Sequence, residues 1–550
     1  MYGWQYIAPY IAKCKAQLMA VMLASLMSTA LSLIVPSLNG DLIDLLTTSD
    51  DYERVLRSAL VIVALSLIGI LATYAATIIT VSITAKTSFN LTSRTILHMQ
   101  KIPYDKFVAE FNPAYLIQRI NSDSGTILSF FTNNFAGVFM QAVILSLSMI
   151  LMATINLTIF FASLFFIPIY IACYAAVRNP MHDRNYAFKE ESNKFSKILY
   201  EQIAGVLRIK TDAAFGLSIK EEERGFNDYY KRVMSLNKIN YVFNSLDSII
   251  EVVFQCFVLL FGGLLIVNGE LTIGGFVVVN IYFTLMLSSV KYYFNLGKSY
   301  QEYKASVLRM DEIYSISEEP NGKLDVPAPS EIRAESITYT YPGKDKNVLS
   351  EVSVTIKKGE ITTIVGPNGS GKTTLANVLI GILGPMPEGT ICYDGHDIRE
   401  IDMYHFRSSH LSVLLQCDQC PDVTVGKFII DTLGANLDEV EKIIREMSLG
   451  SVYLDSSPSL IDYWDSPFNS LSGGEKRKVM LLKALGKKSG MIILDEPTTF
   501  LDKKGSDDLA SYLRRAKADN IILMITHDSR MIAISDKQIT MGGEVSASVV

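Results

Sequence analysis

A glycine-rich segment in the C-terminal half has the residue types and spacing that bind phosphate groups. It follows the apolar run 361–365, precedes an apolar stretch from Leu375, and contains Gly366, Asn368, Gly369, Gly371, Lys372, Thr373 and Thr374. Strand, glycine loop and helix in this order form a P-loop, whose backbone N–H groups close around phosphates at a helix N-terminus. We predict that Lys372 contacts the β- and γ-phosphates and that Thr373 binds Mg²⁺ through its hydroxyl.

Two acidic residues, Asp495 and Glu496, follow a second apolar run at 491–494. An acid at the C-terminal end of a buried strand beside a P-loop is placed to bind Mg²⁺, and we assign this role to Asp495. Glu496 is one residue further on, where it can take a proton from an attacking water. Together with the P-loop, this pair predicts ATP hydrolysis.

The segment Leu471, Ser472, Gly473, Gly474, Glu475 precedes the acidic strand and resembles the signature motif of the ABC ATPases. The resemblance implies ATP and Mg²⁺ as cofactors and gives roles to four further residues. Tyr341 resembles the aromatic that stacks on adenine, Gln416 the Q-loop glutamine that also binds Mg²⁺, Asp502 the D-loop aspartate and His527 the switch histidine.

In that family two ATPase domains sandwich two ATPs, with the signature of one subunit facing the P-loop of the other. The resemblance therefore implies a dimer, and the intact catalytic set makes a second copy of this chain the simpler partner. The sequence departs from the family pattern at Glu475, where glutamine is commoner, at Phe500, where alanine is usual, and at 465–470, which replaces the usual Thr-x-Val-Gly-Glu. Nothing required for hydrolysis is missing.

The N-terminal half is built differently. It holds six apolar runs long enough to cross the hydrocarbon of a lipid bilayer, at roughly 16–40, 55–85, 128–153, 157–177, 246–267 and 273–297. Lys and Arg cluster before the first run, in the long connections 86–127 and 178–245, and after the sixth run, whereas the other turns are mostly acidic. This asymmetry predicts that both termini and both long connections are cytoplasmic.

The expected fold class is an all-α six-helix exporter domain with long cytoplasmic helical extensions, followed by an α/β P-loop ABC nucleotide-binding domain with a helical subdomain. We place the transmembrane domain at 1–310, a linker at 311–330 and the nucleotide-binding domain at 331–550. By resemblance to ABC exporters, coupling helices are expected near 112–115 and 213–216. Cys417 and Cys420 form a C-x-x-C, but no second pair is near to complete a zinc site.

Polar residues on the fifth and sixth runs are candidates for a substrate cavity, because such groups are costly in hydrocarbon and usually face a cavity or the bundle interior. They are Glu251, Gln255, Asn280, Thr284, Lys291 and Asn295. Two alternatives stay open for Glu251 and Lys291: they contact the substrate, or they form a structural ion pair.

We predict ATP-driven export of an amphipathic substrate, a natural peptide or another small molecule, by alternating access coupled to formation of the ATP sandwich. A lipid or lipid-linked flippase of the same architecture is the alternative, since it shares every ATPase motif. An importer is disfavoured, because its membrane domain is usually a separate chain, and an ABC protein that hydrolyses ATP without pumping is rarer.

Lysine-rich usage and the absence of a targeting peptide suggest a bacterial inner membrane. The net charge of −6 gives no reason to expect nucleic acid as a partner. Residues 1–15 leave no room before the first run for an N-terminal peptidase domain, so we expect any peptide cargo to be mature on arrival or processed elsewhere.

Overall fold

The computed structural model describes residues 8–9, 12–48, 51–111, 113–384, 388–415, 422–456, 458–542 and 548–549. The chain divides into two compact units, one formed by 1–93 and 120–311 and the other by 94–119 and 312–550. The segment 94–119, from the first cytoplasmic connection, therefore packs with the C-terminal residues. The domain boundaries predicted from the sequence, at 310 and 331, stay a prediction.

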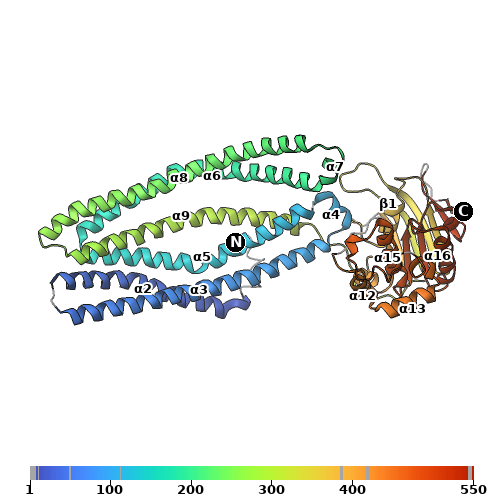
Figure 1. The fold of residues 1–550 in the computed structure, drawn as a ribbon, viewed down its shortest axis with the longest axis horizontal. Helices are drawn as coiled ribbons and strands as arrows, with labels where there is room; N and C mark the ends of the chain where they lie inside the picture. Colours follow the sequence, from blue (N-terminus) through green and yellow to red (C-terminus); the bar gives the residue numbers. More distant parts are fainter. Residues whose placement is uncertain are drawn as a thin grey trace. The chain divides into compact units, whose positions relative to one another are not determined.

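Long helices make up the first unit (Figure 1). A 3-10 turn, Ala12–Cys14, precedes the helices of the N-terminal part: α2 (Lys15–Thr48), α3 (Tyr52–Gln100), α4 (Tyr104–Glu110), α5 (Pro113–Ile155), α6 (Leu157–Ala204), α7 (Val206–Thr211), α8 (Phe215–Val267) and α9 (Ile273–Ser315). By length and composition, 6 of them can cross a membrane. This confirms the predicted six spans. In the most apolar window of α3 only 6% of the residues are buried, as expected of side chains that face lipid.

Two glycines allow α2 and α9 to approach closely. A Cβ added to Gly274 would lie 2.0 Å from the carbonyl oxygen of Gly40, and one added to Gly40 would lie 2.4 Å from a methyl group of Val278. The Gly274 N–H donates a hydrogen bond of 2.7 Å to the carboxylate of Asp44 on α2. Small residues at such crossings bring helix backbones into van der Waals contact, which is how membrane helices pack.

The second unit is an α/β domain with two sheets. Its strands are β1 (Glu331–Tyr339), β2 (Leu349–Lys357), β3 (Ile361–Val365), β4 (Glu388–Tyr393), β5 (His396–Asp397), β6 (Leu411–Leu414), β7 (Met491–Asp495), β8 (Ile521–Ile525), β9 (Lys537–Thr540) and β10 (Ser548–Val549). An antiparallel sheet has the order β2-β1-β4-β5. The larger sheet has the order β10-β9-β3-β8-β7-β6 and is parallel except for β10.

Helices of the second unit flank these strands (Figure 1). They are α10 (Lys372–Leu379), α11 (Met403–Ser409), α12 (Val425–Leu433), α13 (Leu437–Met447), α14 (Gly450–Tyr453), the 3-10 turn Phe468–Ser470, α15 (Gly473–Gly486), α16 (Lys503–Ala516) and α17 (Ser529–Ile532). Strands β7 and β8 are buried along their whole length. Their continuous apolar sequence is typical of parallel strands covered on both faces.

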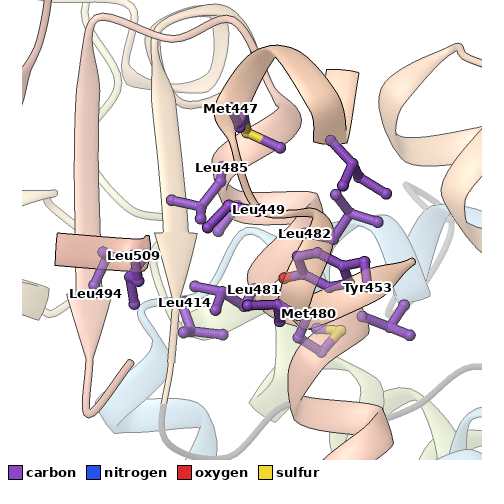
Figure 2. Packing of buried hydrophobic residues seen from close by; sticks show 14 of the residues in the cluster. Leu414, Met447, Leu449, Tyr453, Met480, Leu481, Leu482, Leu485, Leu494 and Leu509 are labelled. Carbon is purple, nitrogen blue, oxygen red and sulfur yellow. The ribbon is translucent and has the colours of Figure 1, made fainter. Parts of the chain in front are cut away.

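One apolar cluster joins the helical part of this unit to the large sheet. Figure 2 shows α15 side chains packed among those of neighbouring helices and strands, including Leu414 of β6, Tyr453 of α14 and Leu494 of β7. Helix α15 therefore has its position fixed from both sides, by the sheet and by the helices.

The crossing of α2 and α9 leads to a stability prediction. Gly274→Ala should destabilise the first unit by about 2 kcal/mol, the usual scale of overpacking, because the new methyl group meets backbone that cannot move aside. Thermal unfolding of the detergent-purified protein measures this. Gly263→Ala on α8 is the control, since a Cβ there meets nothing within 4 Å. Equal unfolding temperatures for the two variants would contradict the close approach.

Candidate functional site

Three neighbouring strands end at the same edge of the large sheet and bring the predicted catalytic segments together. Ile525, the last residue of β8, pairs with Ile364 of β3 on one side and with Asp495 of β7 on the other. The Glu496 N–H continues this ladder with a 2.8 Å hydrogen bond to the Ile525 carbonyl. Three segments therefore lie next to one another at this edge of the sheet: the P-loop after β3, the acids at the end of β7, and the residues after β8.

The P-loop backbone adopts φ angles that are accessible mainly to glycine. Gly366, Gly369 and Gly371 have φ of +151°, +80° and +92°, which side chains rarely adopt, and a Cβ on Gly366 would lie 2.1 Å from the Met541 carbonyl. Asn368 and Gly369 are exposed at the tip of the loop, and Gly371 is the N-cap of α10. The loop therefore presents its backbone at a helix N-terminus, as anion binding requires.

The Lys372 ammonium lies inside this loop. The side chain is buried, and its Nζ donates hydrogen bonds of 2.6 and 3.0 Å to the carbonyls of Gly366 and Pro367. A buried ammonium whose hydrogen bonds go to two neutral carbonyls can still form a strong charge-assisted bond with an anion.

A hydroxyl and a carboxylate meet next to the loop. Thr373 Oγ1 donates to Asp495 Oδ2 over 3.1 Å, and Asp495 is only 3% exposed. Burial raises the pKa of the Asp495 carboxyl, while Thr373 and the cations Arg477 and Lys372 oppose the rise. Hydroxyl and carboxylate oxygens are the ligands that Mg²⁺ prefers, so these residues fit that ion.

Glu496 and His527 face each other across the strand ends. His527 Nε2 lies 3.9 Å from Glu496 Oε1, and the Thr526 hydroxyl donates to the other carboxylate oxygen over 3.4 Å. Glu496 has φ of +49°, a left-handed conformation that is uncommon for a residue with a side chain. Such backbone is held by its surroundings and clusters at functional sites.

The signature residues open α15. Ser472 is its N-cap, and Ser472 and Glu475 form a reciprocal capping box, so Glu475 has a structural role where glutamine is commoner. Gly473 and Gly474 are the first residues of the helix. A Cβ on Gly474 would contact the Phe500 side chain at 3.5 Å, and Phe500 is 59% exposed with φ of +74°.

The remaining predicted residues of this unit occupy three places. The Tyr341 hydroxyl lies 3.1 Å from that of Thr374, just after the P-loop. Asp502 is the N-cap of α16 and accepts a hydrogen bond from the Gly505 N–H. Gln416, like Cys417 and Cys420, lies outside the described residues.

The polar residues of the fifth and sixth spans are only partly brought together. Thr284 donates a hydrogen bond of 3.4 Å to Glu251, and Lys291 Nζ lies 5.9 Å from the centre of the Phe243 ring. No ion pair joins Glu251 to Lys291 among the side chains that the structure describes. Asn280 bonds to the carbonyl one turn earlier, and Gln255 and Asn295 are exposed.

Two features were not predicted from the sequence. A cavity of about 550 Å³ lies between α5 and α9, lined mainly by aromatic residues, namely Phe130, Phe131, Phe135, Tyr293 and Tyr300, together with Asn134, Val138, Leu296 and Gly297. The second is the buried carboxylate of Asp105 on α4. An aromatic cluster at i, i+1, i+5 on one span was a usable signal for the cavity, whereas Asp105 is bonded to residues far away in the sequence.

Comparison with known proteins gives two family matches within this one chain. Residues 18–290 match the ABC transporter transmembrane region, and residues 349–499 match the ABC transporter ATPase family. A solved structure described as a bacterial Atm1-family ABC exporter with ATP bound superposes with a TM-score of 0.80 at 18% identity, covering 96% of this chain and 94% of that one. This likeness supports the fold.

Similar curated proteins include bacterial peptide transporters. The lactococcin-A transport/processing ATP-binding protein LcnC of Lactococcus lactis is 26% identical over 76% of this chain, which spans 59% of that protein's length. The transport/processing ATP-binding protein ComA of Streptococcus pneumoniae is 23% identical over 97% of this chain and 74% of its own length. The ATP-dependent lipid A-core flippase of Vibrio cholerae is 27% identical over 49% of this chain and 47% of its own length.

The position of Lys372 gives a binding prediction. Lys372→Ala should weaken ATP binding about tenfold or more, the scale of one charged hydrogen bond, as measured by titration of the purified protein. The control is Lys487→Ala, because Lys487 also donates to two backbone carbonyls, those of Arg407 and Leu411, outside the loop. Unchanged ATP affinity in Lys372→Ala, or an equal loss in both variants, would contradict the P-loop assignment.

Proposed function

Because this chain belongs to the ABC transporter family and is a multi-pass integral membrane protein whose ATPase domain binds ATP, we propose that it is an ATP-driven exporter. The observation that carries this proposal is the union in one chain of the transmembrane region, 18–290, and the ATPase region, 349–499. The whole-chain likeness to an exporter structure supports it.

We assign the steps of hydrolysis to the residues at the strand ends. Lys372 and the P-loop amides hold the phosphates, Glu496 takes the proton from the attacking water, and His527 lies where it can stabilise the developing charge. Thr373 and Asp495, with Gln416, would hold Mg²⁺, which when bound would neutralise charge on the phosphate oxygens. Tyr341 would stack on the adenine.

The half-transporter fold suggests a dimer, and we propose that the partner is a second copy of this chain. Ser472, Gly473 and Gly474 lie at the N-terminus of α15, where backbone N–H groups and the helix dipole attract a phosphate. In this proposal they complete the ATP site of the other subunit. The exposed Phe500 lies beside the signature, since a Cβ added to Gly474 would lie 3.5 Å from its side chain.

We propose an amphipathic cargo, with a natural peptide as the first candidate. The names of LcnC and ComA refer to transport and processing, and lactococcin is named in the first. The aromatic cavity between α5 and α9 supports an apolar group on the cargo. A lipid substrate is the second candidate, supported by the similarity to a lipid A-core flippase.

The distribution of Lys and Arg supports an orientation with both termini and both long connections in the cytoplasm. The ATPase unit then lies on the side where ATP is made. The bacterial relatives support a bacterial inner membrane as the location.

The role of Glu496 predicts a separation of ATP binding from hydrolysis. Glu496→Gln should bind ATP and lose steady-state ATPase activity by about 10²-fold or more, because an amide cannot accept the proton of the attacking water. Phosphate release and nucleotide titration measure the two properties. Turnover within a few-fold of the unmodified protein would show that Glu496 is not the base.

Transport itself is tested in proteoliposomes with the ATPase unit outward. A fluorescent amphipathic peptide should accumulate inside with ATP and fail to accumulate with Glu496→Gln. Movement of a fluorescent phospholipid but not of the peptide would favour the flippase. ATP hydrolysis without movement of either probe would contradict export and favour a regulatory protein.

A dimer with composite sites predicts complementation between two inactive variants. Lys372→Ala damages the P-loop, and Ser472→Arg damages the signature. A mixed dimer, isolated through two affinity tags, has one site with both lesions and one intact site, so it should hydrolyse ATP while both homodimers stay at background. Background activity in the mixed dimer, or full activity in a strictly monomeric preparation, would contradict the composite site.

A further inference from the structure

The aromatic cavity lies between two sets of contacts that join α5 to α9, which run side by side (Figure 1). On one side of the cavity the Phe130 ring stacks on the Tyr303 ring, with centroids 4.8 Å apart, and Tyr303 is 3% exposed. On the other side the Tyr293 hydroxyl donates to the Val138 carbonyl over 2.7 Å. The cavity is therefore a built part of the fold and not a gap between two helices that fail to touch.

The polar groups in the cavity wall are used within the protein. The Asn134 side-chain oxygen accepts a hydrogen bond of 2.9 Å from the Tyr292 hydroxyl, and its amide donates to the Phe130 carbonyl over 2.7 Å. The Tyr293 hydroxyl is bonded to Val138, as described above. Among the residues that the structure describes, no acidic or basic side chain lines the cavity. The wall therefore offers a ligand mainly the faces and edges of aromatic rings.

Gly297 and two exposed rings leave space for a ligand. A Cβ added to Gly297 would meet nothing within 4 Å, so the surface of α9 is bare at this point. Phe135 and Tyr300 are each 49% exposed, so a ligand can reach the cavity without displacing buried side chains. The volume of about 550 Å³ lies within the range of small-molecule sites, about 300–1,000 Å³, which suits a side chain or small group and not a whole peptide.

The surrounding lipid decides which groups gain by entering this cavity. An aliphatic chain gains little, because the acyl chains of the bilayer are as apolar as the cavity wall. An ionised group would lose its hydration without meeting an opposite charge. An aromatic ring gains offset-stacked and edge-to-face contacts with other rings, which acyl chains cannot offer. The cavity therefore favours uncharged aromatic groups over both other classes.

From these observations we propose that the aromatic cavity binds an uncharged aromatic side chain of the exported peptide, such as that of tryptophan or phenylalanine. The inference rests on the proposed function, since it names the chemistry of the cargo. Residues 130–138 lie near the start of the third predicted span, and residues 293–300 lie at the end of the sixth. In the proposed orientation these are the cytoplasmic ends, so the ring is bound on the side where export begins.

The test measures peptide binding to the full chain in lipid nanodiscs without ATP. The probes are three dye-labelled amphipathic peptides that are identical except at one position, which is Trp, Leu or Lys. Fluorescence anisotropy gives the Kd of each peptide, and empty nanodiscs give the partition into lipid, which is subtracted. We expect the Trp peptide to bind about tenfold more tightly than the Leu peptide, the scale of two ring pairs, and the Lys peptide to bind most weakly.

Gly297→Leu fills the cavity from α9. Gly263→Leu is the matched control, because a Cβ at Gly263 on α8 also meets nothing within 4 Å. Gly297→Leu should weaken binding of the Trp peptide about tenfold and remove its advantage over the Leu peptide, whereas Gly263→Leu should keep both Kd values. Tyr300→Leu keeps an apolar wall but removes one ring, so it should reduce the advantage about threefold. If Gly297→Leu fails to fold, Tyr300→Leu decides alone.

Three results would overturn the proposal: equal Kd values for the Trp and Leu peptides in the unmodified protein, no binding of any peptide, or an unchanged Kd of the Trp peptide in Gly297→Leu. Two other occupants have outcomes of their own that would also overturn it. Loss of fluorescent-phospholipid binding in Gly297→Leu, with the peptides unaffected, would show an acyl-chain site. A changed oligomeric state of Gly297→Leu in native mass spectrometry, again with the peptides unaffected, would show contact with a second copy.

These measurements need neither hydrolysis nor transport. A protein that binds the Trp peptide as expected but moves no cargo would refute export and leave the cavity assignment standing. Transport that persists without any preference for the Trp peptide would refute the cavity assignment alone.

Discussion

The parallel register of β3, β8 and β7 is the constraint on which the nucleotide site depends. Ile525 pairs with residues of both neighbours, and this sets the P-loop, the acids and His527 at one edge. All residues of β7 and β8 are buried, and all except Asp495 are apolar, so the two faces of these strands do not distinguish one register from a slipped one. Polar contacts at the strand ends distinguish the native register: the Glu496 N–H donates to the Ile525 carbonyl, and the Thr373 hydroxyl donates to the Asp495 carboxylate.

Arg477 connects the ends of the strands to α15, the helix that begins at the signature motif. Its guanidinium donates to the carbonyls of Leu415, after β6, and of Asp495, at the end of β7. Arg477 lies on α15, whose first turn holds Ser472 and whose other face enters the apolar cluster of Figure 2. The strand that carries the catalytic acids and the helix that carries the signature are therefore fixed to each other, so movement of one displaces the other.

The parts predicted from the sequence are those encoded by adjacent residues. The strand expected at 361–365 is β3, and the run at 491–494 is β7 with one more residue. The six spans follow from apolar length alone. An ion pair between Glu251 and Lys291 was one of the two alternatives that the sequence left open, and the rotation of each helix about its own axis, which decides it, is set by packing. Asn280 and Thr284 satisfy their polar groups on carbonyls of their own helix, so a polar stripe does not require a cavity.

The first cytoplasmic connection and the predicted linker share a further property: neither is a loose tether. Glu319 forms a partly buried ion pair with Arg407 of α11, and Glu318 pairs with His98 and Lys101 at the end of α3. Helix α3 itself runs unbroken from Tyr52 to Gln100, through the residues where the two units divide. A continuous helix transmits displacement along its axis far better than a coil, whose bonds rotate freely. Residues 94–100 of α3 belong to the same unit as the nucleotide site, so these bonded contacts hold the end of a membrane-crossing helix to that unit.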